Sequence, residues 1–264
     1  IYKLIMYSKI ALSIGGSDSG GGAGIQADLR TFMALKVHGC SVITCITAQN
    51  SIEVTCVQPV EKNTLLNQLG TLFADFGIDA LKTGMLLNER IINDTASKLN
   101  TYKITKIIDP VMVTRTGSKL LEDSAINAYK KLLLPIADLV TPNIYEANLL
   151  SGLEIRSKED IENSARKIIG LGAKAVLIKG GGLKDMKGKD FFLDLNGRKE
   201  WLFNNFINTK NTHGSGCTLS AAICGYKALG FDLFDSIQKA KLFVEKSLEN
   251  SYKIGSGPGP LGHH

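Results

Sequence analysis

The sequence lacks the cysteine patterns of a disulfide-stabilised or zinc-binding protein. Its five cysteines are an odd number, and no two of them form a C-x-x-C pair. Disulfide frameworks and structural zinc sites both favour paired cysteines at short, regular spacings. We therefore expect free thiols and a protein of the reducing cytoplasm.

Long apolar runs and clusters of basic residues are also missing. No apolar run reaches the roughly 20 residues that a membrane-spanning helix needs, and the apolar first residues lack the layout of a signal peptide. The formal charge is +6, but the 31 lysines and arginines are spread along the chain. We expect neither a membrane nor a nucleic acid as partner. A small ligand carrying phosphate would benefit from the positive charge.

Two common nucleotide-binding patterns are absent or misplaced. The P-loop pattern G-x-x-x-x-G-K-[ST] does not occur. Gly22–Ala27 reads G-x-G-x-x-A, but it begins too far beyond the predicted strand that ends at Ile14. No acidic residue ends the second predicted strand near Thr47, as a dinucleotide site would require. Any nucleotide is therefore expected in another type of loop.

What the chain does contain is a regular alternation of apolar strands and amphipathic helices. Its 264 residues are 44% hydrophobic with only 6 prolines, which is typical of a compact domain with a substantial core. The predicted strands are Lys9–Ile14, Gly39–Thr47, Ala80–Thr83, Lys106–Ile108, Ala137–Val140 and Ala175–Ile178, followed by a hairpin of Phe191–Leu195 and Glu200–Phe203. Predicted helices follow the first glycine loop and cover Val60–Phe76, Asn88–Leu99, Glu122–Leu133, Tyr145–Leu150, Lys158–Leu171, Cys217–Leu229 and Leu233–Glu249. This order predicts a single α/β domain over residues 1–264, with a mostly parallel central sheet and helices on both faces.

The chemically notable residues follow the ends of these predicted strands. In open parallel sheets, ligands bind beyond the carboxyl ends of the strands. The residues found there are Gly16, Asp18, Gln49, Met85, Asp109, Asn143, Glu146 and Lys179. We therefore predict one ligand site along this edge.

The stretch Asn211–Ala222, NTHGSGCTLSAA, has the composition of an anion-binding loop. Two glycines bracket Ser215, and a small-residue apolar run follows. A glycine turn that enters a helix directs free N–H groups and the positive end of the helix dipole at one point. That arrangement would hold phosphate or the charge of a moving phosphoryl group. The simpler alternative is a flexible loop that caps an amphipathic helix.

Three charged residues extend this phosphate hypothesis. Asp109 and Glu146 supply hard oxygen atoms at neighbouring strand ends, which could hold Mg²⁺ directly or through its waters. Lys179 precedes three glycines and could reach a nucleotide phosphate. Each residue also has a structural alternative. Asp109 could be a turn residue, Glu146 a charge at a helix start and Lys179 a surface lysine. The glycine loop favours the metal and phosphate reading.

Two further pairs have functional and structural readings. Asp28 and Gln49 could read the edge of an aminopyrimidine or a pyridine ring, or could be a helix surface charge and a loop amide. Cys217 is expected at a helix N-terminus, where the pKa of its thiol should be lowered, with His213 close in sequence. A cysteine hydrolase would need a distant histidine and a third orienting group, and no such set is evident.

Seven ordered motifs carry a family resemblance. They are Ala11–Phe32, Thr47–Asn50, Lys82–Leu86, Asp109–Val113, Thr141–Ala147, Lys179–Gly181 and Asn211–Ala222. From about Ile10 onward the chain resembles the hydroxymethylpyrimidine/phosphomethylpyrimidine kinases of thiamine biosynthesis, within the ribokinase-like superfamily. The resemblance implies a three-layer ribokinase-like fold, ATP and Mg²⁺, and a pyrimidine hydroxymethyl group as acceptor. It also implies a second transfer that converts the monophosphate to the diphosphate.

The resemblance also assigns site residues. It implies a pyrimidine pocket of Gly16, Asp28, Gln49, Met85 and Val111; ATP contacts from Asn143, Lys179 and Thr212; magnesium contacts from Asp109 and Glu146; and a catalytic anion hole of Gly214, Ser215, Gly216 and Cys217. Sugar kinases of the superfamily have an aspartate base where this chain has Cys217. The thiol could act as base if its pKa is depressed, or positioning and electrostatics could suffice.

The sequence leaves two other functions open. A pyridoxal or pyridoxine kinase is the first, because relatives with cysteine in this loop can accept that similar ring. A non-catalytic module that binds a pyrimidine or a B vitamin is the second, although it would not need Asp109, Glu146, Lys179 and the glycine loop. Many relatives are dimers, so the resemblance implies a homodimer.

Overall fold

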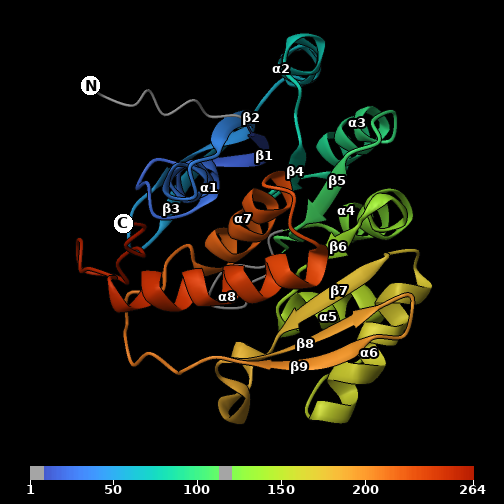
Figure 1. The fold of residues 1–264 in the computed structure, drawn as a ribbon. Coiled ribbons are helices and arrows are strands. Elements are labelled where there is room, and N and C mark those ends of the chain that lie inside the picture. The colour runs from blue at the N-terminus through green and yellow to red at the C-terminus, as the bar shows by residue number, and fades with distance from the viewer. Residues whose placement is uncertain (1–8, 113–120) are drawn as a thin grey trace.

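A computed structural model describes residues 9–112 and 121–264, and Figure 1 shows the arrangement of their elements. Nine strands form one sheet in the order β3-β2-β1-β4-β5-β6-β7-β8-β9. The strands are β1 (Ile10–Asp18), β2 (His38–Gln49), β3 (Val54–Pro59), β4 (Ala80–Thr83), β5 (Thr105–Ile108), β6 (Leu139–Val140), β7 (Ala175–Lys179), β8 (Lys189–Asp194) and β9 (Lys199–Phe203). The six strands from β2 to β7 in the sheet order pair in parallel, and β3, β8 and β9 pair antiparallel at the two edges.

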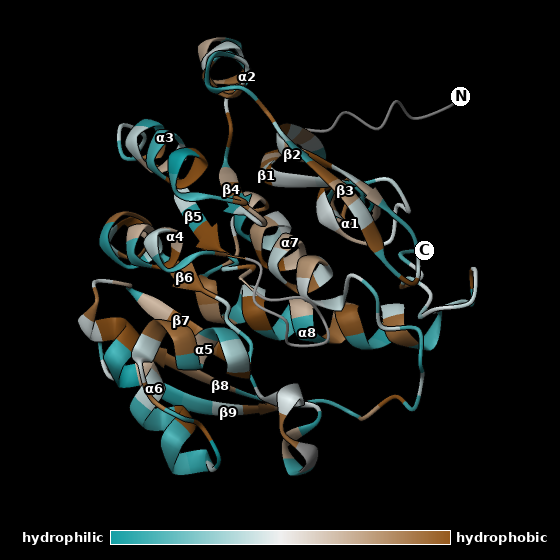
Figure 2. Cartoon of the chain, turned by 180° about the vertical axis from the view of Figure 1, so that it is seen from behind, coloured by the Kyte–Doolittle hydropathy of each residue, from teal (hydrophilic) through white to brown (hydrophobic). Residues whose placement is uncertain are grey.

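Helices cover both faces of this sheet. They are α1 (Gly24–Ala34), α2 (Lys62–Asp75), α3 (Glu89–Leu99), α4 (Asp123–Ala128), α5 (Ile144–Ser151), α6 (Lys158–Gly170), α7 (Ser215–Ala228) and α8 (Leu233–Glu249). A π-helical turn, Tyr129–Leu133, continues α4, and short 3-10 turns cover Leu134–Ile136, Gly180–Gly182 and Lys184–Met186. Helices α1, α7 and α8 lie on one side of the sheet, and α2 to α6 lie on the other (Figures 1 and 2).

Alternating apolar residues of the strands build a core on each face. Ala80 and Ile107 pack with the α1, α7 and α8 side, whereas Leu81 and Ile108 pack with the α2 to α6 side. Successive side chains of a strand point to opposite faces, so a sheet covered on both sides needs uninterrupted apolar strands. The sheet is therefore a rigid central layer that holds its strand ends in fixed positions.

The predicted three-layer α/β fold is confirmed, with two local corrections. The strand β1 does not end before the glycine pair, because it continues to Asp18 with a register shift between Gly15 and Ser17. The edge strand β3 was not predicted, since five of its six residues are exposed and the apolar pattern is weak. The hairpin of β8 and β9 and the long helix α8 match their predicted positions.

Candidate active site

The structure gathers most of the predicted residues at the carboxyl edge of the parallel strands. Asp109 directly follows β5, Lys179 ends β7, and Gln49 ends β2. Helix α7 packs against β1, β4 and β5, and it begins at Ser215 beside this edge. The fold therefore brings the glycine loop and the strand-end residues together, although they are far apart in the sequence.

A buried ion pair between Asp109 and Lys179 joins β5 to β7. Lys179 Nζ lies 3.2 Å from Asp109 Oδ1, which also accepts a hydrogen bond from Thr141 Oγ1 at 3.2 Å. Ser220 of α7 donates to Asp109 Oδ2 at 2.8 Å. Burial lowers the pKa of Lys179, but the carboxylates of Asp109 and Glu146 outweigh it and raise the pKa above its ordinary value. Lys179 is therefore a permanent cation at neutral pH.

Glu146 is held beside this pair by the start of α5. Asn143 caps the helix, its Oδ1 accepting from the Glu146 N–H at 2.9 Å, while Glu146 Oε2 accepts from the Asn143 N–H at 2.8 Å. Burial raises the pKa of Glu146 to about 7, with Asp109 adding to the effect and Lys179 opposing it. A carboxyl group with this pKa is poised to respond to a nearby cation, because a positive charge favours its ionised form.

The N-terminus of α7 depends on a close approach between two glycine loops. Gly214 has a φ of +85°, and a Cβ at that position would lie 2.0 Å from the carbonyl oxygen of Gly22. Ser215 donates its N–H to Thr212 within the loop at 3.2 Å, and the first bond of the helix runs from Thr218 N–H to Gly214 O. The N–H groups of Gly216 and Cys217 precede that first bond and form the open end of the helix.

Lys179 also faces this open helix end. A Cβ at Gly216 would stand 3.5 Å from Lys179 Nζ. The ammonium group, the N–H groups and the helix dipole thus converge on one position. The arrangement can hold a phosphate and stabilise the charge that spreads over a phosphoryl group during its transfer.

The expected low pKa of Cys217 is wrong. Burial raises the pKa of this thiol to about 11, even though Lys82 opposes the shift. The Gly24 N–H also favours the thiolate, but removal from water disfavours it more strongly. The thiol is therefore protonated at neutral pH.

Asp28 is not at an open surface but in the core. Its side chain is 1% exposed and pairs with buried Lys82, whose Nζ lies 3.0 Å from Asp28 Oδ2. Ser13 donates to the same oxygen at 2.6 Å. Burial lowers the pKa of Lys82, but Asp28 outweighs it and raises the pKa above its ordinary value. Asp28 therefore holds a buried cation between α1 and β4.

The other predicted pocket residues lie in three places. Gly16 lies against Met85, because a Cβ at Gly16 would stand 2.7 Å from Met85 Cε. Gln49 lies across from His213, with 3.4 Å between Gln49 Nε2 and His213 Nε2. Val111 is half-buried and donates its N–H to Asp109 O at 2.9 Å.

The sequence did not predict the contacts of Lys82 and Ser220, nor that Asp18 and His213 would pair. His213 Nε2 lies 2.9 Å from Asp18 Oδ2, across 195 positions of the chain. The signal for Lys82 was its place inside a mostly apolar strand, where an unpaired charge would be costly. Ser220 has no comparable signal, because serine is common in helices.

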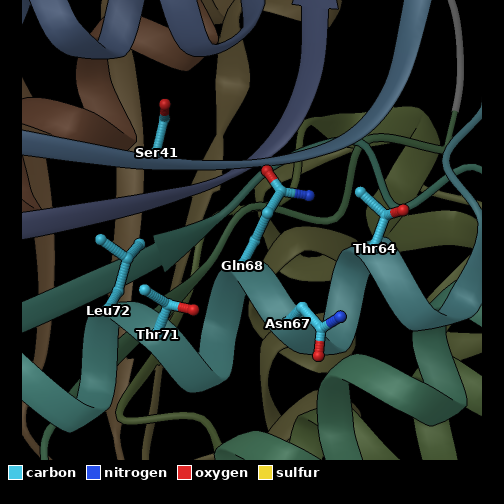
Figure 3. Close-up of a pocket in the computed structure, with 6 residues that line it drawn as sticks. All are labelled: Ser41, Thr64, Asn67, Gln68, Thr71 and Leu72. Atoms are coloured by element: carbon cyan, nitrogen blue, oxygen red, sulfur yellow. The ribbon is translucent and has the colours of Figure 1, made fainter.

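One surface pocket lies away from these residues. Residues of β2 and α2 line it, and Figure 3 shows them as Ser41, Thr64, Asn67, Gln68, Thr71 and Leu72. Gln68 already bonds the backbone of Ile43 through both ends of its amide, at 2.9 and 3.1 Å. The pocket contains no predicted site residue.

Two further absences apply to residues 9–112 and 121–264. No group of three or more His, Cys, Asp or Glu side chains is arranged to hold a metal ion there. In the same ranges, no helix is both long and apolar enough to cross a bilayer.

Comparisons with known proteins agree with this geometry. A family model described as phosphomethylpyrimidine kinase matches residues 18–262. The chain is 49% identical over 259 residues to the hydroxymethylpyrimidine/phosphomethylpyrimidine kinase of Synechococcus elongatus, covering 98% of each chain.

Two solved structures are similar to this chain over most of its length, and their names state two different substrates. An ADP complex of Bacillus subtilis pyridoxal kinase superposes with a TM-score of 0.90, 38% identity and 97% of each chain covered. A phosphomethylpyrimidine kinase from Clostridium difficile gives a TM-score of 0.81 and 37% identity, covering 89% of this chain and 97% of that one. The near full-length identity and the family match have one explanation: this chain is a phosphotransferase that belongs to the phosphomethylpyrimidine kinase family.

Proposed function

We propose that the protein uses ATP to phosphorylate the hydroxymethyl group of 4-amino-5-hydroxymethyl-2-methylpyrimidine and then the resulting monophosphate. The product is the pyrimidine diphosphate, a precursor in thiamine biosynthesis. The observation that carries the proposal is the meeting of Lys179, Asp109 and the open end of α7 at one edge of the sheet. The names of the relatives supply the choice of acceptor.

The acceptor ring is assigned to the end of β1 and its neighbours. Gly16 leaves room for Met85 beside the ring, and Gln49 offers an amide to its polar edge. Val111 is assigned to the same pocket. In this proposal Asp28 does not contact the ring directly, because its oxygens already bond Ser13 and Lys82. It supports the pocket by holding Lys82 in place.

The phosphoryl group is assigned to the end of α7. The N–H groups of Gly216 and Cys217 point to the oxygens that gain charge, and Gly214 and Ser215 hold the loop in position. Lys179, Asn143 and Thr212 are the proposed ATP contacts. A fixed set of donors of this kind needs no rearrangement when the transition state forms.

The acidic residues fit a hydrated magnesium ion. Asp109 accepts three side-chain hydrogen bonds and Glu146 accepts two backbone ones, which leaves about one acceptor position on Asp109 and about two on Glu146 for waters of the ion. Mg²⁺ usually keeps several waters and binds through one or two carboxylates and the substrate phosphates. When bound, it would neutralise phosphate charge during the transfer. Asp109 and Glu146 would hold its water shell.

Cys217 is assigned a positioning role. A thiol with a pKa of about 11 is a protonated group at neutral pH and is not free to take a proton from the acceptor hydroxyl. A loose transition state for phosphoryl transfer needs little help from a base. The backbone N–H of Cys217 contributes to the anion hole whatever the state of its side chain.

The experiment is a steady-state comparison of three acceptors with ATP and Mg²⁺: hydroxymethylpyrimidine, its monophosphate and pyridoxal. We expect the two pyrimidines to have a kcat/KM at least tenfold above that of pyridoxal. A preference for pyridoxal would keep the phosphate chemistry and contradict the acceptor. No turnover with any of the three would favour a non-catalytic binding module.

Pyridoxal is the second candidate because the superposition on the Bacillus subtilis pyridoxal kinase is close over 97% of the chain. The curated relatives at higher identity are named as pyrimidine kinases, so we place pyridoxal second.

We also propose one kinase domain, a cytoplasmic location and a homodimer. One continuous sheet supports the single domain, and five free cysteines fit a reducing compartment. The edge hairpin of β2 and β3 exposes Ile46, Ile52, Val54 and Val57, with exposed fractions of 39 to 70%. An exposed apolar edge strand is a ready pairing surface for a second copy. Light scattering should give twice the chain mass, and Val57→Lys should shift it to the monomer.

A further inference from the structure

A segment that follows α8 lies against the loop that leads into α7. This segment, residues 259–263, is called the strap, and the chain turns back there toward α1 and β3 (Figure 1). Gly259 donates its N–H to Asn211 Oδ1 at 3.0 Å, and the His213 N–H donates to Gly259 O at 3.1 Å. A β-bridge also pairs His213 with Pro260. The strap therefore holds the chain immediately before Gly214.

The strap is a packed part of the fold. Leu261 is 1% exposed, and Gly262 donates its N–H to Ser247 O of α8 at 3.0 Å. A Cβ at Gly259 would overlap the carbonyl oxygen of Tyr252, so the close turn at this position requires glycine. Buried apolar surface and backbone hydrogen bonds thus fix the strap to α8.

The far end of the strap reaches the first turn of α7. His263 Nε2 shares a hydrogen bond with Thr218 Oγ1 at 2.9 Å, and Thr218 is fully buried. The His263 ring lies beside Phe243, with 6.4 Å between the ring centroids. Burial lowers the pKa of the imidazole to about 4, and the charges of Arg30 and His264 add to the effect. The ring is therefore neutral at neutral pH, with one N–H and one acceptor nitrogen, and either can pair with a hydroxyl group.

Thr218 is the residue at which the hydrogen bonding of α7 begins. Its N–H donates to Gly214 O at 2.8 Å, and it directly follows Gly216 and Cys217, whose N–H groups form the open end of the helix. A hydrogen bond to its side chain opposes fraying of this first turn. The strap thus holds the proposed anion hole on both sides, before Gly214 and after Cys217.

We infer that the strap positions the anion hole for phosphoryl transfer, and that His263 is a positioning residue that acts through Thr218. Donors that are fixed in advance stabilise the charge of the transition state without rearrangement. If the first turn of α7 loosens, that stabilisation is lost while the ground-state contacts of the substrates remain, so kcat falls and KM does not change. The inference rests on the proposed function, since it assumes that the end of α7 receives the phosphoryl group.

A double-mutant cycle tests this relationship, because it separates an effect transmitted through Thr218 from a general one. The variants are His263→Phe, which keeps a ring beside Phe243 but cannot bond the hydroxyl group; His263→Gln, which keeps a donor and an acceptor; Thr218→Val, which replaces the hydroxyl group by a methyl group of similar size; and His263→Phe combined with Thr218→Val. Gly152→Ala is the control for a loss of stability away from the site. For each, kcat, KM for hydroxymethylpyrimidine, KM for ATP and the melting temperature are measured.

We expect His263→Phe and Thr218→Val each to lower kcat by about three- to tenfold, the usual effect of one lost hydrogen bond, while both KM values stay within about twofold. The double variant should have a kcat within about twofold of either single variant, because all three lack the same bond. His263→Gln should recover most of the loss. Gly152→Ala should have a lower melting temperature and a normal kcat.

Losses that multiply in the double variant would overturn the inference, as would single variants with kcat within twofold of the unmodified protein or with losses in KM instead of kcat. If His263→Phe does not fold, which its melting temperature shows, the kcat of Thr218→Val decides by the same criterion. Failure of the proposed function has a different signature. In that case the unmodified protein would neither turn over the pyrimidine nor bind it by calorimetry.

Discussion

Lys179 Nζ lies 3.2 Å from Asp109 Oδ1, and this contact connects the ends of two parallel strands at the open end of α7. Asp109 is 2% exposed, and the side chain of Lys179 is 18% exposed. A buried carboxylate and an ammonium of limited exposure stabilise each other here, and the ammonium can still reach a phosphate. The pair thus stabilises the sheet edge, and it also places an ammonium group where the proposed phosphoryl transfer takes place.

Replacing Lys179 should damage catalysis far more than replacing a surface lysine at the other end of β7. Lys179→Met removes the cation next to the phosphoryl position, so we expect kcat/KM for ATP to fall by about 100-fold or more. The control is Lys174→Met, which removes a lysine that is 61% exposed in its side chain and pairs with Asp138. Steady-state kinetics with varied ATP give both values. A Lys179→Met enzyme within twofold of the unmodified protein would contradict the assignment.

Gly214 can be tested against a glycine of similar backbone geometry. Gly214→Ala meets both a positive φ and a Cβ contact of 2.0 Å with Gly22 O, whereas Gly152 has a φ of +72° and open space around it. Gly152→Ala should lose about 1 kcal/mol of stability with normal kcat, which is the cost of the left-handed backbone alone. Gly214→Ala should lose more stability and at least about tenfold in kcat, because the two loops must separate. Denaturant melts and kinetics distinguish the two effects. Identical behaviour of the variants would mean that the contact between the loops has no role.

The buried pair of Asp28 and Lys82 gives a prediction about folding. Lys82→Met leaves Asp28 without its cation in the core, so the free energy of unfolding should fall by about 3 kcal/mol or more. The double variant Asp28→Leu with Lys82→Met removes both charges, and it should recover a large part of that loss. Chemical denaturation measures the cycle. Additive losses in the double variant would show that the two side chains do not stabilise each other.

The thiol of Cys217 should react slowly at neutral pH. Burial raises its pKa to about 11, so the thiolate fraction grows about tenfold per pH unit up to that value. Alkylation by iodoacetamide, followed on the separated peptides, should accelerate through pH 10 without levelling. The peptide of exposed Cys56 is the internal control for reagent access. A Cys217 alkylation rate that levels off below pH 8 would show that the thiol has a low pKa and is a reactive thiolate at neutral pH.

Much of this site could be predicted from the sequence because strand ends are easy to locate. Apolar strands buried on both faces give clear patterns; Asp109 directly follows one of them, and Lys179 is the last residue of another. The alternation of strands and helices then places these residues on one edge of the sheet. No contact had to be known for that inference.

What the sequence could not give depends on contacts across the fold. The pKa of Cys217 was expected to be low from its helix position, but burial beneath neighbouring elements outweighs that local effect. Asp28 has the spacing of a helix surface charge, and only the approach of β4 shows that it pairs with Lys82. The edge strand β3 forms because β2 offers a free edge, and its own residues carry little pattern.

The most direct test of the central claim is a phosphorus NMR time course of the purified protein with ATP, Mg²⁺ and hydroxymethylpyrimidine. The account predicts a monophosphate ester signal that rises first and then declines as the two signals of a diphosphate ester grow, both absent without enzyme. Conversion of ATP to ADP with no new ester, or an ester formed only when pyridoxal replaces the pyrimidine, would contradict it.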